Sequence, residues 1–355
     1  MKTYRNLFGQ LCSMDNLERA FKNARKGKTG KPYVLEFVQD LENNIERLHG
    51  ELISGTYQPL PLRTFILRDP KTRKISVSDF RDRIVHHAIC NVLEPIFERY
   101  FIYDSYANRK GKGSLAALER FDEFKRKVSH GGSCPPHVSD ANAVKGFVLK
   151  ADIRHYFDTV DHQKLLGIIG GKIKDEKVLE LIGKIVANHR GKRLGVGMPL
   201  GNLTSQFFAN VYLDKLDQFV KHDLKAKHYI RYVDDFIILH HSASQLRKWK
   251  KSIDIFLQTM LLLELHQQKS AIHPLASGVD FLGFRCFYHF RLLRKRNVRK
   301  MEKKLEWSKT LLKEGKMTVG EILEIVQGWN AYAMHADTYT LRRRMMNATL
   351  AIIQH

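Results

Sequence analysis

The sequence predicts a mixed α/β (α+β) fold with two or three lobes around a sizeable core. Short apolar segments rich in β-branched residues, such as GFVLKADI, alternate with segments whose apolar residues recur every three to four positions. A chain of 355 residues is long enough for more than one lobe. From Arg294 onward the pattern is strongly basic and helical.

The N-terminal region is predicted to be helical. Asp15, with Glu18 three residues later, indicates the N-cap of a helix that continues to Lys26. After a GKTGK break, an amphipathic pattern predicts one longer helix over residues 32–53. We therefore predict an N-terminal helical extension over residues 1–57.

The central region alternates between strands and helices. TFILRD and KISVSD predict two β segments around a turn at Asp69-Pro70-Lys71, and DRIVHHAICNVLEPIFERYF predicts a helix. Residues 127–145 are rich in Gly, Pro and Ser, which predicts an exposed loop. KVLELIGKIVANH predicts a helix, and HYIRYVDDFIILH predicts two strands that meet at a tight turn. FLGFRCFYHFRLL predicts a further short hairpin.

The charge balance favours a polyanionic partner. Lys and Arg number 60 against 37 Asp and Glu, which gives a formal net charge of +23 and a pI near 9.8. Nucleic acid is the leading partner, because cations that neutralise phosphates release counterions. A basic scaffold protein, such as a ribosomal one, or a protein on acidic lipid remains an alternative.

The cysteine pattern and the hydropathy of the chain indicate its cellular compartment. The four cysteines form no C-x-x-C pair, which argues against a zinc ribbon and a secreted disulfide framework; they are Cys12, Cys90, Cys134 and Cys286. No apolar run reaches the roughly 20 residues of a membrane helix, and the N-terminus lacks a signal-peptide pattern. We expect a reduced, cytoplasmic protein with no membrane partner.

Two acidic clusters stand in apolar β context. Asp152 ends GFVLKAD, and Asp234-Asp235 interrupt RYVDDFIILH. A carboxylate on a buried strand is costly unless it is paired or binds a metal, and adjacent aspartates repel each other. Divalent cations such as Mg²⁺ remove both objections. The alternative is structural: Asp152 caps a turn, and Asp234-Asp235 are ordinary residues of a hairpin tip.

Several motifs together resemble those of reverse transcriptases. Tyr-Val-Asp-Asp resembles their Y-x-D-D box, and DIRHYFDTVDH resembles the box with their first metal-binding aspartate. ISVSDFRDRIVHHAICNVLEPIFERYFIYDSYANRKGKG is similar to their two fingers motifs, and GMPLGNLTSQFFANVYL to their template-grip motif. HQQKSAI and VDFLGF are similar to the last palm motifs, and the basic end with QGWNAYAMHADT to the thumb. These motifs follow the family's order over most of residues 60–345.

The resemblance implies an RNA-directed DNA polymerase, a nucleotidyltransferase that extends a primer strand on template RNA with deoxynucleoside triphosphates. The implied fold is a right-hand polymerase with fingers, a ferredoxin-like palm and a helical thumb. Fingers and palm would occupy residues 58–290, and the basic helical thumb residues 291–355. Because few residues follow Arg344, we expect no ribonuclease H or endonuclease domain.

Metal ligands are implied at four positions. Asp152, Asp234 and Asp235 match the catalytic carboxylates, and Ile153 would contribute its backbone carbonyl. Together they would hold two Mg²⁺ ions, with Mn²⁺ as an alternative.

Substrate contacts are implied at further positions. Arg73, Lys71 and Arg83 lie where cations would hold the triphosphate, with Arg73 favoured because an arginine fork suits phosphate oxygens. Lys269 matches a lysine near the departing pyrophosphate; the alternative for it, and for Lys71, is a solvated surface lysine.

One aromatic residue is a candidate for sugar selection. Phe157 matches the aromatic residue that blocks a nucleotide 2′-hydroxyl. Simple core packing is the alternative, and the neighbouring Tyr156 is the other candidate for the core position.

The grip motif resembles that of diversity-generating retroelements. Where retroviral and group II intron enzymes read P-Q-G-x-x-x-S-P, this chain has Leu200, Gly201 and, at the last position, Gln206. Enzymes of that type copy a template-repeat RNA with errors opposite adenines, which leads to mutagenic retrohoming. A leucine offers only apolar contact where glutamine can hydrogen-bond, which would relax discrimination; a neutral packing change is the alternative.

This subtype carries expectations about partners and rivals. It implies a bacterial or phage-encoded enzyme that acts with a small basic, pentameric accessory variability protein. The rivals are a group II intron-like, retron or phage-defence reverse transcriptase, and a non-catalytic RNA-binding protein with a polymerase fold.

Overall fold

The chain forms two compact units, each assembled from separate stretches of sequence. The computed structural model describes residues 2–68, 72–130, 144–191 and 193–354. The units are unit 1, with Met1–Gly113, Ala151–Ile237 and Lys248–Ser270, and unit 2, with Ser114–Lys150, Ile238–Arg247 and Ala271–His355.

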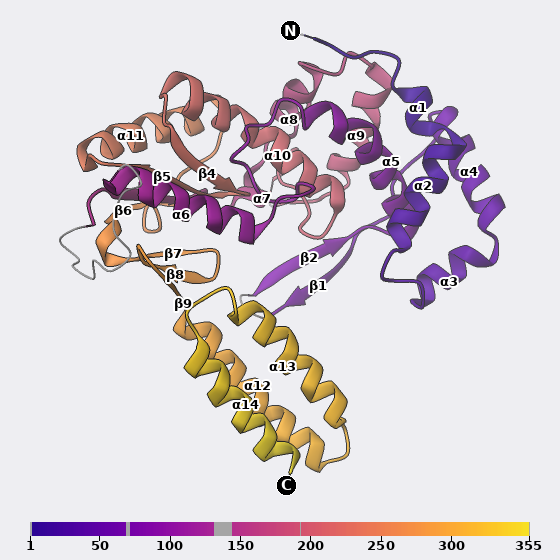
Figure 1. Cartoon of the computed structure of the whole chain (residues 1–355). Coiled ribbons are helices and arrows are strands. Elements are labelled where there is room, and N and C mark those ends of the chain that lie inside the picture. The colour runs from indigo at the N-terminus through magenta and orange to yellow at the C-terminus, as the bar shows by residue number, and fades with distance from the viewer. Residues whose placement is uncertain (1, 69–71, 131–143, 192, 355) are drawn as a thin grey trace. The chain divides into compact units, whose positions relative to one another are not determined.

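Helices make up most of the described elements (Figure 1). In chain order they are α1 (Phe8–Cys12), α2 (Met14–Arg25), α3 (Pro32–Gln39), α4 (Leu41–Ile53), α5 (Phe80–Phe97), α6 (Ser114–His130), α7 (Tyr156–Thr159), α8 (His162–Gly170), α9 (Glu176–Ala187), α10 (Leu203–Gln218), the π-helix η2 (Phe219–Asp223), α11 (Ala243–Met260), the 3-10 helix η3 (Leu275–Ser277), α12 (Lys295–Lys313), α13 (Val319–Ala333) and α14 (Tyr339–Ile353).

The described strands form small sheets. In chain order they are β1 (Arg63–Leu67), β2 (Arg73–Val77), β3 (Phe147–Asp152), β4 (His228–Tyr232), β5 (Asp235–His240), β6 (Ala271–Pro274), β7 (Val279–Phe281), β8 (Phe284–Cys286) and β9 (Arg291–Leu293). β1 and β2 form an antiparallel hairpin. A four-stranded sheet has the strand order β4-β5-β3-β6, and β7, β8 and β9 form an antiparallel meander. The strands expected in TFILRD, KISVSD, GFVLKADI and HYIRYVDDFIILH are confirmed. The hairpin expected in FLGFRCFYHFRLL is confirmed as β8 and β9, and β7 pairs with β8 to extend it to three strands.

The N-terminal helices begin and end at other residues than the sequence predicts. Ser13, not Asp15, caps α2, because its hydroxyl accepts the Asn16 N–H at 3.3 Å. The single helix expected over residues 32–53 is wrong: α3 and α4 are separated at Asp40, whose φ of −134° and ψ of +53° are not helical. The Asp40 carboxylate accepts from the Asn43 side chain at 2.7 Å, a local bond that competes with helical backbone geometry.

Helix α5 lies at the centre of unit 1. It packs against α10 and against α1, α2 and α3, which are drawn in indigo (Figure 1). Its apolar residues are fully buried and include Ile84, Val85, Ala88, Ile89 and Leu93. An apolar surface that surrounds much of a helix requires neighbours on more than one side.

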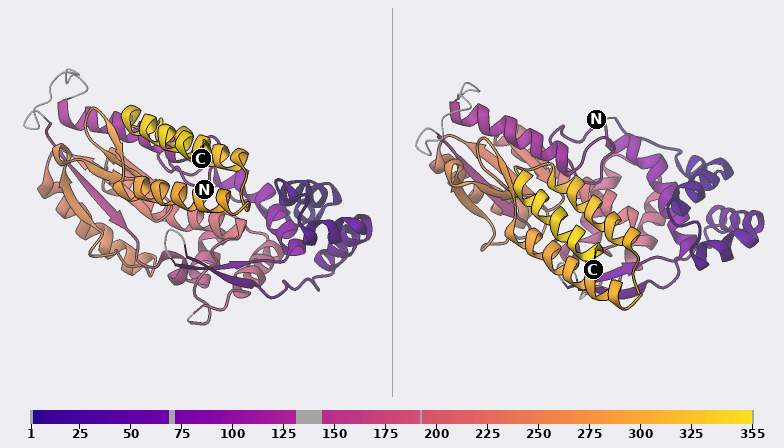
Figure 2. Two further views of the ribbon diagram at one scale, coloured as in Figure 1. Left: turned by 90° about the horizontal axis from the view of Figure 1, so that it is seen from below. Right: turned by 60° about the horizontal axis from the view of Figure 1, so that its bottom comes forward.

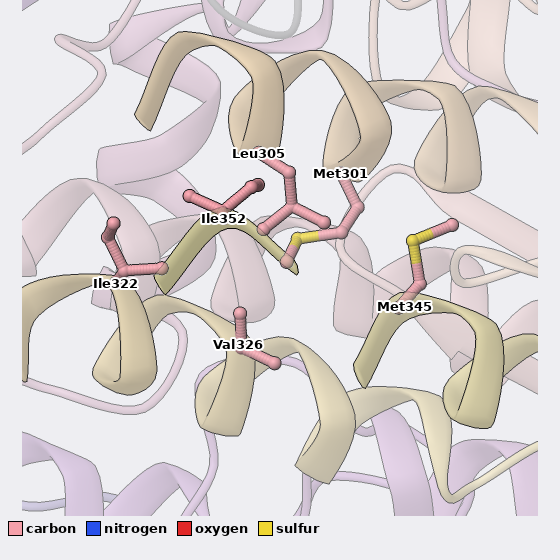
Figure 3. Packing of buried hydrophobic residues seen from close by; sticks show 6 residues of the cluster. All are labelled: Met301, Leu305, Ile322, Val326, Met345 and Ile352. Atoms are coloured by element: carbon pink, nitrogen blue, oxygen red, sulfur yellow. The ribbon is translucent and has the colours of Figure 1, made fainter. Parts of the chain in front are cut away.

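In unit 2, α12, α13 and α14 form the C-terminal bundle and lie side by side in every view (Figures 1 and 2). Figure 3 shows its core, which consists of Met301, Leu305, Ile322, Val326, Met345 and Ile352. Thr318 and Glu321 form a capping box at the start of α13, and Gly315 ends α12 with a φ of +67°. The basic C-terminal region is therefore helical, as predicted.

The predicted loop over residues 127–145 is partly helical, because α6 continues to residue 130; residues 131–143 lie outside the described ranges. Cys12, Cys90 and Cys286 are buried free thiols, and Cys134 is not described. In the part of the chain that the structure describes, no helix has the length and apolar character to span a bilayer.

Candidate active site

Asp152 stands at the end of β3, and a neighbouring segment fixes this strand end. The Asp152 carbonyl accepts a hydrogen bond from the His266 N–H at 2.8 Å, and its own N–H donates to the Ser270 hydroxyl at 3.3 Å. The half-buried Asp152 carboxylate accepts from the Lys269 ammonium at 3.2 Å. Two predicted site residues that are far apart in sequence are thus joined by a salt bridge.

Asp234 and Asp235 lie at the tight turn that the sequence predicts between β4 and β5. Val233, which precedes them, has a φ of +56°, where a β-branched residue is strained. The Ile153 N–H donates to the Asp234 carbonyl at 3.3 Å. This bond ties the turn to the residue after Asp152, so the fold brings the two predicted acidic positions together.

The three aspartates share one electrostatic environment. The pKa of Asp234 is raised to about 6, first because burial disfavours its charged form and then because the charges of Asp235 and Asp152 lie nearby. The Arg73 guanidinium opposes this shift. We call Asp152, Asp234 and Asp235 the carboxylate cluster.

The donor chemistry of the carboxylate cluster fits a hard divalent cation. Mg²⁺ prefers oxygen ligands, and a bound cation would remove the repulsion that raises the Asp234 pKa. Among the described residues, no three His, Cys, Asp or Glu side chains converge closely enough to form a ready-made metal site. The assignment of the cluster and the Ile153 carbonyl as metal ligands therefore stays a prediction.

The arginines predicted to hold the triphosphate lie in different surroundings. Arg73 begins β2, is exposed and acts on the carboxylate cluster through its charge. Arg83 lies in α5, where its Nε donates to the Ser78 carbonyl at 2.9 Å and its guanidinium lies over the Tyr33 ring. Lys71 lies outside the described residues. The structure thus groups Arg73 with the cluster and anchors Arg83 within the helical region.

The loop with Leu200 is attached to β2 by residues that the sequence does not mark. The Ser76 N–H donates to the Leu200 carbonyl, and the Ser78 N–H to the Asn202 side-chain oxygen, each at 3.0 Å. An Asn before a helix usually caps it, whereas Asn202 makes no side-chain cap bond to α10. Gln206 lies half-buried in the first turns of that helix.

Gly201 is required by the approach of β2. Its φ of +120° belongs to a region that side chains rarely adopt. A Cβ at this position would lie 3.0 Å from the Ile75 side chain and 3.1 Å from that of Val77. The backbone of the loop can therefore approach the strand closely only as glycine.

Tyr156 and Phe157 divide the two roles that the sequence leaves open. Tyr156 is 2% exposed, and its hydroxyl donates to the Ala209 carbonyl at 3.0 Å, so it is the core residue. Phe157 is half-buried, with its ring 5.3 Å from that of Tyr156 and its carbonyl accepting the Met198 N–H at 2.7 Å. Its partly exposed ring leaves a role in substrate selection as a prediction.

The chain is similar to a known protein family and to several known proteins. A family model described as reverse transcriptase (RNA-dependent DNA polymerase) matches residues 68–286. The group II intron-encoded protein LtrA of Lactococcus lactis subsp. cremoris is 25% identical over 80% of this chain, which spans 57% of the length of that relative. The protein YkfC of Escherichia coli (strain K12) is 28% identical over 71% of this chain and 72% of its own. A telomerase structure from Candida tropicalis covers 69% of this chain and 58% of its own at 13% identity, with a TM-score of 0.48.

Proposed function

The chain belongs to the reverse transcriptase family, and we propose that it copies an RNA template into DNA by adding deoxynucleotides to a primer strand. Its mixed helices and sheets form the right-hand polymerase fold of that family. The observation that carries the proposal is the carboxylate cluster, where the end of β3 meets the turn between β4 and β5.

The chain's own groups are assigned as follows. Asp152, Asp234 and Asp235, with the Ile153 carbonyl, hold two Mg²⁺ ions, or Mn²⁺ as an alternative. When bound, such ions lower the pKa of the primer 3′-hydroxyl and neutralise the triphosphate and the departing pyrophosphate. Lys269, whose ammonium lies 3.2 Å from the Asp152 carboxylate, is assigned to the pyrophosphate side.

Substrate contacts are assigned to the surrounding elements. Arg73 binds the triphosphate, supported by its electrostatic reach to Asp234, and Lys71 and Arg83 are further candidates. Phe157 excludes the 2′-hydroxyl of a ribonucleotide. The surplus of 60 Lys and Arg over 37 Asp and Glu favours binding of an RNA–DNA hybrid, largely through its phosphates.

Within the family, we propose the diversity-generating type, with frequent errors opposite template adenines, mutagenic retrohoming and a small basic accessory protein as partner. Leu200 and Gln206 support this subtype. The Leu200 carbonyl is held by Ser76, so residue 200 has a fixed backbone from which only an apolar side chain projects. Loss of a polar constraint of about 1–3 kcal/mol on the base pair would relax discrimination.

A group II intron-like reverse transcriptase is the second candidate. It is favoured by the likeness to LtrA, a group II intron-encoded protein. Error spectra separate the two candidates, because only the first predicts errors concentrated at one template base.

The test is primer extension on an RNA template with Mg²⁺ and the four deoxynucleoside triphosphates, followed by sequencing of the products. Asp234→Asn should abolish product. Asp214→Asn is the matched control, because burial also raises the pKa of Asp214 to about 6, yet this residue lies on α10 and hydrogen-bonds Gln218. The control should retain activity within about threefold of the wild type.

The outcomes separate the proposals. No product from folded wild-type protein, with or without an added accessory protein and native RNA, would refute the polymerase proposal and favour an RNA-binding protein. Equal loss in both variants would refute the assigned role of Asp234. Product with errors spread evenly over the template bases would favour the group II intron-like candidate.

A further inference from the structure

Arg231, one residue before Tyr232 in β4, is a fully buried side chain, and so is its partner Asp217 on α10. Its Nε donates to one Asp217 oxygen at 2.7 Å and its Nη2 to the other at 2.6 Å. Burial acts to lower the pKa of Arg231, but the Asp217 charge and hydrogen bonds outweigh it and raise the pKa. The guanidinium is therefore a permanent charge inside unit 1.

The remaining guanidinium protons are also engaged. Nη1 donates to the Asn210 side-chain oxygen and to the Val233 carbonyl, each at 3.1 Å, and Nη2 donates to the Ser105 hydroxyl at 3.2 Å. A guanidinium has five N–H donors in a rigid fork, and each of them meets an acceptor here. The arrangement explains why two polar residues, Ser105 and Asn210, are buried with exposed fractions of 0% and 1%.

One of these acceptors belongs to the turn that carries the catalytic carboxylates. Val233 is held at a φ of +56°, a conformation that a β-branched residue keeps only where its surroundings fix it. The backbone of Arg231 is fixed in turn, because its N–H donates to the Asp104 carbonyl and its carbonyl accepts the Tyr106 N–H, each at 3.0 Å. A rigid group thus holds a strained peptide directly before Asp234.

We propose that Arg231 is a positioning residue whose guanidinium clamps the Val233 carbonyl and so fixes how Asp234 and Asp235 present their carboxylates. This inference rests on the proposed polymerase function for its kinetic consequence. The clamp itself is a property of the protein without substrate.

The main test is Arg231→Lys. Lysine keeps the charge beside Asp217, but an ammonium at one point cannot span both that carboxylate and the Val233 carbonyl. In primer extension with Mg²⁺, kcat should fall about 100-fold, because displacement of a catalytic group by about 1 Å has effects of this size. KM for the deoxynucleotide should change less than about threefold, because Arg73 is untouched.

Tyr229→Phe is the matched control. It removes the hydrogen bond from the Tyr229 hydroxyl to Asp217 (2.7 Å) in the same buried network and leaves all five guanidinium bonds intact. This variant should lower Tm by roughly 2–4 °C while kcat stays within about twofold of the wild type.

A second-site variant and a hydrogen-exchange measurement without substrate distinguish a positioning role of Arg231 from an effect on stability alone. Glycine adopts a positive φ without strain, so Val233→Gly added to Arg231→Lys should restore kcat about tenfold. Backbone amide hydrogen exchange of the peptide over residues 228–240 should be faster in Arg231→Lys and unchanged in Tyr229→Phe. If Arg231→Lys does not fold, Asn210→Ala, which removes the acceptor that shares Nη1 with Val233, should lower kcat about tenfold and speed the same exchange.

The outcomes are decisive. Wild-type kcat or wild-type exchange in folded Arg231→Lys, or in Asn210→Ala where the first variant does not fold, overturns the proposal. An equal loss of kcat in Tyr229→Phe also overturns it, since the network would then act through stability alone. If the wild type makes no DNA, the proposed function fails, while the exchange rates still decide the clamp.

Discussion

Replacing Gly201 with alanine should push β2 away from the loop that carries Leu200. The new Cβ would lie 3.0 Å from Ile75 and 3.1 Å from Val77, closer than side chains normally pack. The strand and the loop must separate by a few tenths of an ångström, which strains the hydrogen bond from Ser76 to Leu200. Because Arg73 begins the same strand, its electrostatic effect on Asp234 should change too.

The magnitude follows from two contributions. Backbone strain for a non-glycine residue at this φ costs about 1–3 kcal/mol, and the contact with β2 adds about 1–3 kcal/mol. Gly113 has a φ of +125°, and a Cβ added there would meet nothing within 4 Å, so Gly113→Ala carries the strain alone. The difference in energy cost between the two variants therefore gives the cost of the contact with β2 alone. A cost of about 1.4 kcal/mol corresponds to a tenfold lower kcat/KM.

The assay is steady-state primer extension on an RNA template with varied deoxynucleotide concentration, alongside urea unfolding of both variants. Gly201→Ala should lower kcat/KM about tenfold relative to Gly113→Ala, mainly through a higher KM, because the triphosphate contact moves. If the two variants have equal kcat/KM, the attachment of β2 to the loop does not position the substrate, and the reasoning is refuted.

Three further predictions concern pH, packing and the salt bridge at Asp152. Burial lowers the pKa of His86 to about 3, so on acidification the unfolded chain takes up a proton that the folded protein does not. Between pH 7.5 and pH 5, the free energy of unfolding measured with urea should therefore fall by about 2 kcal/mol more in the wild type than in His86→Gln. An equal fall in the two proteins would contradict this prediction. Ile322→Ala in the C-terminal bundle should cost about 2–4 kcal/mol, against less than about 1 kcal/mol for the neighbouring, exposed Leu323→Ala, and equal urea midpoints would rule out the packing argument. Lys269→Ala should change stability by less than about 1 kcal/mol, because the salt bridge is partly exposed, yet lower kcat about 100-fold; native kcat would remove Lys269 from the mechanism.

Much of the fold follows from local pattern. The runs that form β3, β4 and β5 are apolar and short, and the tight turn at Asp234-Asp235 lies where the two runs meet. Helix ends are harder to predict, because neighbouring polar residues compete. Ser13 and Asp15 are both good caps, and Asp40 sits inside an amphipathic pattern that looks continuous although its side chain bonds locally to Asn43.

The site also contains both residues that the sequence predicts and residues that it does not. The carboxylate cluster can be predicted because its aspartates conflict with their apolar surroundings, which is visible in the sequence alone. The sequence alone cannot distinguish the roles of Arg73 and Arg83, because only the folded chain shows that Arg83 donates a hydrogen bond to the Ser78 carbonyl. Arg231 carries no sequence signal either, because an arginine beside a strand end looks solvated until its buried partner Asp217 is known.

The pairing of β3 with β6 has a consequence for synthesis on the ribosome. These strands pair from Phe147 with Pro274 to Lys150 with Ala271, so β3 is translated about 120 residues before its partner. At roughly 5–20 residues per second, the edge of β3 that pairs with β6 stays open for about 6–24 s. During that interval Val148 and Leu149, both completely buried in the finished protein, are open to intermolecular strand pairing. We expect the yield of soluble protein to depend on translation rate and chaperone supply more than on the stability of the completed sheet.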